Sequence, residues 1–390
     1  MATPLQQMPI IDVDTHFTEP PDLWTSRAPA KLRDRVPRIE PDARGNPRWR
    51  VDGHHDFGPP GFCVIRSDDT KAAGHFSLRT FEEMTPAATE PKARLAVMDR
   101  EGIAAQIVYP NVLGFAGAEI MQIRDDELRN FCVTAYNDGI AELQASSGGR
   151  ILPQAMLPFW DAGLSLRELI RCHEELGLTG FTMSDSPQKW GTPCLHEPYW
   201  DSLWGEAAER GLPCNFHIGS GGYGGGHWEG LEGGRKVAIM SVTLYIENAR
   251  CISNLIFSGL LDKHPAVKFV SVESGIGWIP FLLEACEYQC HENFEPGRGL
   301  ALTPREYFQR QIYSSFWFER ESVARSIEIL GEDNVMFETD FPHPTCLYPN
   351  PRESMEASIG QLDEALQRKL LYETASRVYQ LDVAKLVQAP

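Results

Sequence analysis

Two residues near the N-terminus, Asp14 and His16, have the types and the spacing of metal ligands. They end a short apolar run over residues 10–16, which is typical of a buried strand. Residues two apart on a strand point to the same face, so the carboxylate and the imidazole can converge on one point. Both groups are ligands for divalent metal ions. One Asp-x-His triplet is weak evidence alone, and it predicts a metal site only if later strands supply further ligands.

Later apolar runs also end in ionisable residues. His217 ends one run, Glu273 ends a second and Asp340 ends a third. Burying so many unpaired charges is costly, and a divalent cation offsets that cost. We therefore predict a metal site, with a purely structural cluster of ion pairs as the alternative. The predicted metal ligands are Asp14, His16, His217, Glu273 and Asp340.

Such convergence requires parallel strands whose carboxyl ends meet, and the rest of the sequence indicates them. Short apolar runs alternate with amphipathic helices, as expected of parallel strands covered on both faces. The expected strands are 10–16, 104–109, 151–157, 178–183, 212–218, 267–273, 311–316 and 335–340. The expected helices are 92–101, 125–146, 162–176, 200–210, 237–260, 280–292 and 321–330, followed by a helical C-terminal extension over 355–390.

Eight strand–helix units predict one α/β domain over residues 1–390, a (β/α)8 TIM barrel. A doubly wound open sheet is the alternative, but no glycine-rich nucleotide loop follows the first strand. Residues from about 20 to 91 form an insertion after strand 1 with little regular periodicity. Long stretches of this kind are usually functional. We expect the insertion to fold over the barrel mouth or to meet a second subunit, with His54, His55 and His75 at the surface.

Composition excludes several classes of partner. The net charge is −18, from 54 acidic and 36 basic residues, so binding to nucleic acid or to anionic membranes is not expected. No apolar run reaches the roughly 20 residues of a membrane span, and the first residues do not resemble a secretory signal. A cytoplasmic location is therefore expected. The nine cysteines include no CxxC pair, which predicts free thiols.

These motifs together resemble the amidohydrolase superfamily, in the amidohydrolase-related branch that contains metal-dependent decarboxylases of aromatic and muconate-type acids. The resemblance covers nearly the whole chain. It rests on Ile11-Asp12-Val13-Asp14-Thr15-His16, Tyr136-Asn137-Asp138, Phe216-His217, the run 272–280 and Glu338-Thr339-Asp340-Phe341-Pro342-His343. It implies that Asp14, His16, His217 and Asp340 bind the metal.

Glu273 departs from this pattern, because the aromatic-acid decarboxylases usually have a histidine there that assists protonation or water activation. As a ligand or bridge, Glu273 would help to hold two metal ions. As a general base, it would need a pKa raised by a low-dielectric site. Pairing with an arginine such as Arg124 is the structural alternative. Asp340 is expected to relay a proton, His343 to orient a ligand or hold substrate, and Glu19 is a weaker candidate for a second metal.

Aromatic residues near the expected mouth predict a substrate with a flat or apolar body. Two of them belong to a glycine-rich segment over 219–228, which suits a mobile loop over the site. The predicted substrate-binding residues are Tyr109, Trp160, Tyr223, Trp228, Phe316 and Trp317.

The leading hypothesis is a metal-dependent hydrolase or carboxy-lyase. Its expected substrate is a small organic acid, with an aromatic acid as one option, or a related carbonyl compound. The expected cofactor is Zn or Mn, which would polarise a substrate oxygen or activate water. The second hypothesis is a dinuclear Fe or Mn/Fe oxidase or hydroxylase. The third is a non-catalytic partner subunit of an active homologue. A homo-oligomer, namely a dimer, is expected, with a hetero-oligomer as the alternative.

Overall fold

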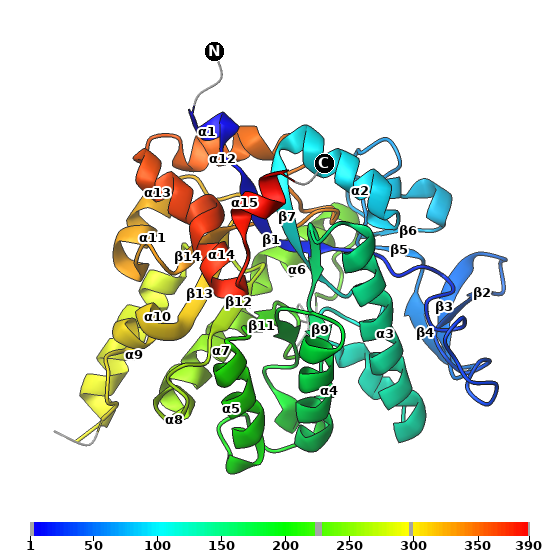
Figure 1. Cartoon of the computed structure of the whole chain (residues 1–390), viewed down its shortest axis with the longest axis horizontal. Coiled ribbons are helices and arrows are strands. Elements are labelled where there is room, and N and C mark those ends of the chain that lie inside the picture. The colour runs from blue at the N-terminus through cyan, green and yellow to red at the C-terminus, as the bar shows by residue number, and fades with distance from the viewer. Residues whose placement is uncertain (1–3, 223–227, 296–298, 389–390) are drawn as a thin grey trace.

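The computed structural model describes residues 4–222, 228–295 and 299–388, and it shows an α/β fold built on parallel strands (Figure 1). The parallel strands form two ladders, in the orders β1-β7-β8 and β14-β13-β12-β11-β10-β9. Each strand run expected from the sequence overlaps at least one of them. Their bounds are β1 (Ile10–His16), β7 (Ile103–Tyr109), β8 (Ile151–Pro153), β9 (Ala155–Met156), β10 (Phe181–Thr182), β11 (Cys214–His217), β12 (Phe269–Val272), β13 (Ile312–Phe316) and β14 (Val335–Phe337).

Backbone hydrogen bonds bring the end of β14 to the end of β1. The N–H of Asp340 donates to the carbonyl of Asp14 at 3.0 Å, and the N–H of His16 donates to the carbonyl of Phe341 at 2.8 Å. Residues near the two ends of the chain therefore meet at the place where metal ligands are predicted.

Two of the strands that carry predicted ligands end before those ligands. β12 ends at Val272 and β14 ends at Phe337, before the predicted ends at Glu273 and Asp340. Glu273 has a φ of 55° and Asp340 a φ of 61°, which lie in the left-handed region and outside the range of a strand. Such a conformation costs a non-glycine residue on the order of 1–3 kcal/mol and is concentrated at functional sites. The backbone therefore turns out of the strand at both predicted ligands.

The helices follow the strands along the chain and lie around the outside of them (Figure 1). The prediction of one continuous helix over 237–260 is wrong, because the chain forms three shorter helices there. The hydroxyls of Ser241 and Thr243 donate to backbone carbonyls four residues earlier, a pattern that bends helices. The bounds are α2 (Pro91–Glu101), α3 (Asp126–Ser146), α4 (Ala162–Glu174), α5 (Asp201–Arg210), α6 (Gly233–Thr243), α7 (Tyr245–Phe257), α8 (Leu260–Lys263), α9 (Ile279–Asn293), α10 (Pro304–Gln311) and α11 (Val323–Leu330).

The C-terminal segment is helical and packs onto the strands. It comprises α12 (Pro351–Ile359), α13 (Glu364–Arg368), α14 (Thr374–Tyr379) and α15 (Val383–Gln388), and α12 lies beside the N-terminal helix α1 (Pro4–Gln7) (Figure 1). One core cluster joins apolar strand residues, such as Val13 and Met336, to Tyr379 of α14. The Tyr379 hydroxyl donates to Asn215 on β11 at 2.7 Å. A larger cluster contains apolar residues of the helices and of the strands.

The segment between β1 and α2 contains strands that the sequence does not predict. β2 (Arg38–Pro41), β3 (Pro47–Val51) and β4 (His55–Gly58) form an antiparallel sheet, and β5 (Gly61–Phe62) pairs with β6 (Ser77–Leu78). These strands escaped prediction because they are short and rich in charged residues and proline. The three-stranded sheet lies to one side of the molecule (Figure 1). Just before it, Arg35 pairs with Asp125 at the start of α3 at 2.8 Å.

Three smaller expectations can be compared with the structure. His54 and His75 are exposed, as expected, whereas His55 is half-buried. All nine cysteines are free thiols, which confirms the prediction. Within the described part of the chain, we find no helix with the length and apolar character needed to cross a bilayer.

Candidate metal centre

Six buried side chains converge where β1, β11, β12 and β14 end. They form two overlapping groups of four, and within each group the potential ligand atoms lie within 4.8 Å of one another. The groups are Asp14, His16, His217 and Glu273, and His16, Glu273, Asp340 and His343. None of the six residues is more than 8% exposed. The structure thus brings together the five predicted metal ligands and His343.

The distances within the two groups are those of donors around a shared ion. His217 Nε2 lies 3.4 Å from Asp14 Oδ1, 3.3 Å from Glu273 Oε2 and 3.0 Å from His16 Nε2. His16 Nε2 lies 3.6 Å from Asp14 Oδ1 and 3.9 Å from Asp340 Oδ1. Two ligands bound about 2.1 Å from one ion are roughly 3 Å apart when adjacent and roughly 4 Å apart when opposite. The observed spacings lie in this range.

Several of the converging atoms are buried without a hydrogen-bond partner among the described residues. They are both carboxylate oxygens of Asp14, Glu273 Oε2 and His343 Nε2, whereas Asp340 Oδ1 lies 2.7 Å from His343 Nδ1. An unpaired buried carboxylate is costly, and a divalent cation would satisfy these oxygens and nitrogens together. The mixture of carboxylate oxygen and imidazole nitrogen suits Zn²⁺ or Mn²⁺. The residues present therefore fit a divalent metal ion.

Backbone carbonyls set the orientation of two histidines. His16 Nδ1 lies 3.3 Å from the carbonyl oxygen of Pro110, and His217 Nδ1 lies 2.9 Å from that of Ile218. Because a carbonyl oxygen only accepts, each Nδ1 must carry the proton in these contacts. Each Nε2 is then left with a lone pair that faces the cluster. This is the arrangement that commonly orients metal-binding histidines.

Burial and mutual repulsion oppose the charged forms of the cluster residues when no cation is present. Burial, followed by the charges of Asp340, Asp14 and Glu338, raises the pKa of Glu273 well above its usual range. Burial and then Asp14 raise the pKa of Asp340 in the same direction. Burial lowers the pKa of His16, and it lowers the pKa of His343 to about 3. A bound cation would reverse the effect on the carboxylates and favour their ionised form.

Glu338 is a buried carboxylate beside the cluster that the motifs give no role. It accepts the backbone N–H of Glu273 at 3.2 Å and the hydroxyl of Ser315. The first of these bonds holds the backbone of Glu273 where its left-handed turn begins. Glu338 lies two residues before Asp340, so the two-residue period of a strand could have indicated that both face the same way.

Phe115 lies against three histidines of the cluster and was also missed. Its ring centroid is 4.6 Å from those of His16 and His217 and 5.2 Å from that of His343. The side chain is half-buried, and it belongs to the loop that follows β7. Phe115 therefore forms an apolar wall of the site. The only sequence signal was an aromatic residue a few positions after a strand end.

Glu19 supports this loop instead of joining the cluster. Its carboxylate accepts the backbone N–H groups of Asn111 and Val112, both at 3.0 Å. Burial raises its pKa to about 7. Glu19 belongs to neither group of potential ligands, which argues against a second metal there. The pairing of Glu273 with Arg124 is not supported either, because Arg124 is exposed and its charge acts on His55 in the insertion.

The predicted aromatic contacts are dispersed. Tyr109 is fully buried in the core cluster, with its ring 5.1 Å from that of His217. Phe316 packs on Phe337 in the other core cluster, which argues against a substrate contact. Phe316 lies between Ser315 and Trp317 in the chain. Successive side chains along a strand point to opposite faces, so the Phe316 side chain points away from the face of its two neighbours.

Two tryptophans differ in whether the indole N–H has a hydrogen-bond acceptor. Trp160 donates to Asn130 at 3.1 Å and lies under the guanidinium of Arg129, so its contacts are with α3. Trp317 is buried and its indole nitrogen has no hydrogen-bond partner among the described residues. Trp228 is half-buried, and Tyr223 lies outside the described residues. Trp317 therefore has an indole N–H without an acceptor among the described residues, and its contact with substrate stays a prediction.

Part of the insertion reaches the cluster. The N–H of Ile65 donates to the carbonyl of Pro342 at 2.9 Å, and Asn111 donates to the carbonyl of Phe62 at 2.9 Å. Burial, followed by the charges of Glu273 and Asp340, raises the pKa of the Cys63 thiol well above its ordinary value. Residues 62–65 therefore lie beside the candidate metal centre.

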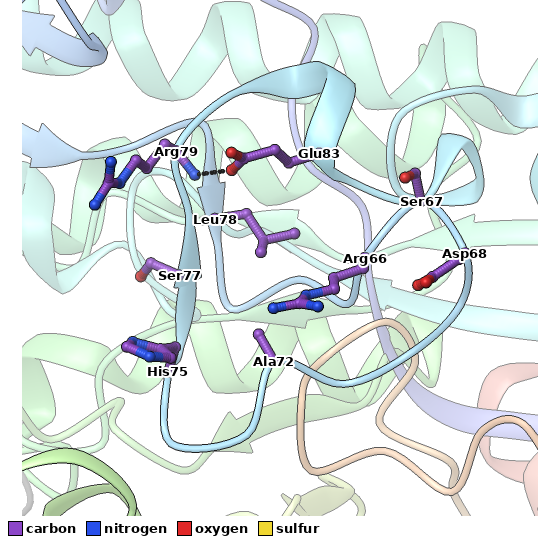
Figure 2. A pocket seen from close by; sticks show the side chains of 9 residues that line it. All are labelled: Arg66, Ser67, Asp68, Ala72, His75, Ser77, Leu78, Arg79 and Glu83. Carbon is purple, nitrogen blue, oxygen red and sulfur yellow. Dashed lines mark hydrogen bonds between the residues drawn. The ribbon is translucent and has the colours of Figure 1, made fainter.

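A cavity of about 410 Å³ lies further along the insertion. Figure 2 shows the residues that line it, which are Arg66, Ser67, Asp68, Ala72, His75, Ser77, Leu78, Arg79 and Glu83. Most of these side chains are exposed, and none belongs to the metal cluster. The cavity is therefore separate from the candidate metal centre.

Known proteins share this fold. The gamma-resorcylate decarboxylase of a Polaromonas species is 26% identical over 279 residues, which cover 64% of this chain and 76% of that protein. The crystal structure of an amidohydrolase from Mycobacterium avium subsp. paratuberculosis matches with a TM-score of 0.72 and 20% identity, over 95% of this chain and 99% of that one. A dihydroxybenzoic acid decarboxylase from Polaromonas, solved with manganese and 2-nitroresorcinol, matches with a TM-score of 0.64 and 19% identity, over 98% and 99%.

The family assignment rests on the sequence. A family model described as amidohydrolase matches residues 11–381, a range that contains all six residues of the candidate metal centre. The resemblance inferred from the motifs is thereby confirmed, and the chain belongs to the amidohydrolase family.

Proposed function

We propose that this chain is a metal-dependent decarboxylase of a small aromatic carboxylic acid. The observation that carries the proposal is the buried cluster of six potential ligands with unpaired oxygens and nitrogens. Support for decarboxylation over hydrolysis comes from the gamma-resorcylate decarboxylase relative. The convergence of all five predicted ligands argues against a non-catalytic partner subunit.

The predicted (β/α)8 barrel is part of this proposal. The backbone bonds between the ends of β1 and β14, with a parallel bridge between Thr15 and Phe341, support closure of the strands into a barrel. In a barrel of this type the active site lies at the carboxyl ends of the strands, where the six residues converge. The contacts of residues 62–65 support an insertion that covers part of the mouth.

Asp14, His16, His217 and Asp340 would hold the ion, with Glu273 as a further ligand. Manganese is the favoured ion, because the Polaromonas dihydroxybenzoic acid decarboxylase was solved with it, and zinc is the alternative. When bound, the ion would bind substrate oxygens and stabilise the negative charge that develops on them.

Decarboxylation breaks the bond between the ring carbon and the carboxylate, and the carbon must gain a proton in exchange for CO2. Asp340 is the candidate for that proton transfer. Its Oδ1 lies 2.7 Å from His343 Nδ1, so His343 can orient the carboxyl group and exchange a proton with it. Phe115 and the adjacent imidazoles offer flat surfaces against which an aromatic ring can stack.

The test is a decarboxylation assay with a panel of hydroxylated benzoic acids, 2,6-dihydroxybenzoate among them. We expect the manganese-loaded protein to release CO2 and the corresponding phenol from at least one acid, and chelation or Asp340→Asn to abolish the reaction. Arg79→Ala, at the separate cavity, is the control and should retain activity. Absence of CO2 release from every acid by metal-loaded protein would contradict the proposal.

An oxygen-activating enzyme with a dinuclear Fe or Mn/Fe site is a second candidate. It is favoured by Glu273, a carboxylate where the related decarboxylases usually have a histidine, and by the two overlapping ligand groups. Oxygen uptake coupled to loss of substrate, without release of CO2, would favour this candidate over the decarboxylase.

A further inference from the structure

We propose that Arg94 is a positioning residue, which fixes the backbone that carries His16 and Asp340 through a buried polar network. Arg94 belongs to neither group of potential metal ligands. The inference rests on the proposed function only in assuming that the cluster binds metal. It does not depend on which reaction follows.

Arg94 is a fully buried cation whose hydrogen-bond acceptors are all neutral. Its side chain extends from α2 and donates to the carbonyl of Ala87 at 2.6 Å, to Gln106 Oε1 at 3.0 Å and to the carbonyl of His16. Burial lowers the pKa of Arg94 to about 10, so the guanidinium stays charged near neutral pH. A buried charge is costly, and an apolar side chain of similar volume is often at least as stable in its place. Stability of the fold is therefore a poor explanation for Arg94.

The contacts of Arg94 fall on the chain around two predicted ligands. The carbonyl of His16 itself accepts one of its N–H groups. The guanidinium lies 5.5 Å from the ring centroid of Phe17, which follows His16, and 4.6 Å from that of Phe341, which follows Asp340. Both distances are within the range of cation–π attraction. One planar cation thus contacts the residue directly after each ligand.

A second branch of the network reaches the end of β14. Gln106 on β7 accepts from Arg94 with its side-chain oxygen and donates with its nitrogen to Asp12 Oδ2 at 3.1 Å. Asp12 on β1 also accepts the backbone N–H of Thr339 at 2.8 Å and the Thr339 hydroxyl at 2.6 Å. Because Thr339 directly precedes Asp340, the network also holds the chain on the other side of that ligand.

The backbone of Asp340 needs such support. Its φ of 61° lies in the left-handed region, which is unfavourable for a residue other than glycine. A conformation of this kind persists only when the surrounding structure fixes it. Thr339 is bound by Asp12, and Phe341 is contacted by Arg94, so both neighbours of Asp340 are fixed.

The competing explanation is that Arg94 only stabilises the fold. In that case its loss lowers the free energy of unfolding, but the protein that remains folded binds metal normally. Arg352 provides a matched comparison, because its side chain also donates to several backbone carbonyls, those of Glu101, Gln6 and Gly102. None of these residues belongs to the metal cluster.

The experiment measures Mn²⁺ affinity by isothermal titration calorimetry on the full chain, after a chelator has removed bound metal. Urea denaturation of the metal-free proteins reports their stability. We expect Arg94→Met to weaken Mn²⁺ binding by about 10- to 100-fold, the effect typical of groups that orient metal ligands. Arg352→Met should also lower the stability, but it should bind Mn²⁺ as tightly as the wild type.

The other outcomes separate this inference from the proposed function. Wild-type affinity in folded Arg94→Met overturns the positioning role and leaves the proposed function intact. Equal weakening in Arg352→Met also overturns it, because any loss of stability would then weaken metal binding. Absence of Mn²⁺ binding by the wild type overturns both proposals.

A second variant covers failure of the first to fold, which circular dichroism detects. Arg94→Lys keeps the charge, but one ammonium group cannot reach all three acceptors of the guanidinium. We expect its Mn²⁺ affinity to fall below that of the wild type, and an unchanged affinity in this folded variant overturns the positioning role.

Discussion

At the scale of single residues, the candidate site consists of side chains that are unfavourable without a cation. Asp14 has two buried carboxylate oxygens without hydrogen-bond partners among the described residues, and Glu273 has one. Glu273 and Asp340 also adopt left-handed backbone conformations. Unpaired buried charges and left-handed residues lower the stability of the fold. Such features persist at sites where a ligand or a reaction requires them.

Phe115 allows a test of the aromatic substrate. Because stacking of aromatic rings contributes about 0.5–1.5 kcal/mol beyond area burial, Phe115→Ala should raise KM by roughly 2- to 12-fold, at 1.4 kcal/mol per factor of ten. Metal content should not change. Steady-state kinetics and metal analysis measure both quantities, and Tyr288→Ala, at an exposed position on α9, is the control. An unchanged KM would show that the substrate does not contact Phe115.

Glu338 allows a test of how Glu273 is positioned. Removing a group that orients a metal ligand typically costs 10- to 100-fold in metal affinity, so Glu338→Ala should weaken Mn²⁺ binding by about that factor. Glu338→Gln retains an oxygen that can accept the N–H of Glu273, and it should bind Mn²⁺ more tightly than the alanine variant. Isothermal titration calorimetry compares the three proteins. Equal affinities in all three would contradict a positioning role.

The residues differ in how far the sequence could predict them. Asp14 and His16 were predictable, because the two-residue period of a strand places both on one face. Glu338 was predictable by the same rule, applied two residues before Asp340. The approach of Phe115 to the histidines depends on the path of a loop, and that path is set by long-range contacts such as those of Glu19. No local pattern encodes such contacts.

At the scale of elements, the alternation of strands and helices was predictable, whereas the departures from it differ in whether the sequence indicates them. α10 begins with a capping box, in which Thr303 and Glu306 exchange hydrogen bonds. That signature was present in the sequence as Thr-Pro-Arg-Glu. The short strands of the insertion lack an apolar alternation, so their pairing is set by tertiary contacts. The early ends of β12 and β14 follow from backbone angles that the sequence does not reveal.

Glu19 acts on the site through the loop that follows β7. Its carboxylate accepts backbone N–H groups of this loop, which also carries Phe115. Glu19→Ala leaves two backbone N–H groups without their acceptor. We expect the loop to loosen, so that KM rises several-fold while metal content stays at the wild-type value. The measurement pairs kinetics with metal analysis. A loss of metal in this variant would instead support Glu19 as a ligand, the alternative considered from the sequence.

At the scale of the whole molecule, a buried acid that is not one of the six ligands predicts part of the pH dependence of stability. Asp185 follows β10, and burial raises its pKa to about 6, from an ordinary value near 4 in the unfolded chain. The folded state therefore binds the proton more tightly than the unfolded state. The stabilisation is present below about pH 4 and is lost as the pH rises through about 6.

The expected size of this loss is about 2–3 kcal/mol, from two pKa units at 1.36 kcal/mol each. Asp185→Asn should remove this contribution, so that its unfolding free energy varies less between pH 4 and pH 7 than that of the wild type. Urea denaturation across this range checks the difference. Parallel pH profiles for the two proteins would contradict the assignment.

The central claim is that the convergence of strand ends creates a metal centre, and metal content tests it most directly. The protein is purified without chelators, and divalent metal per chain is measured for the wild type and for the Asp14→Ala/His217→Ala double variant. We predict at least one ion per chain in the wild type and a near-complete loss in the double variant. Equal metal content in both proteins would contradict the claim.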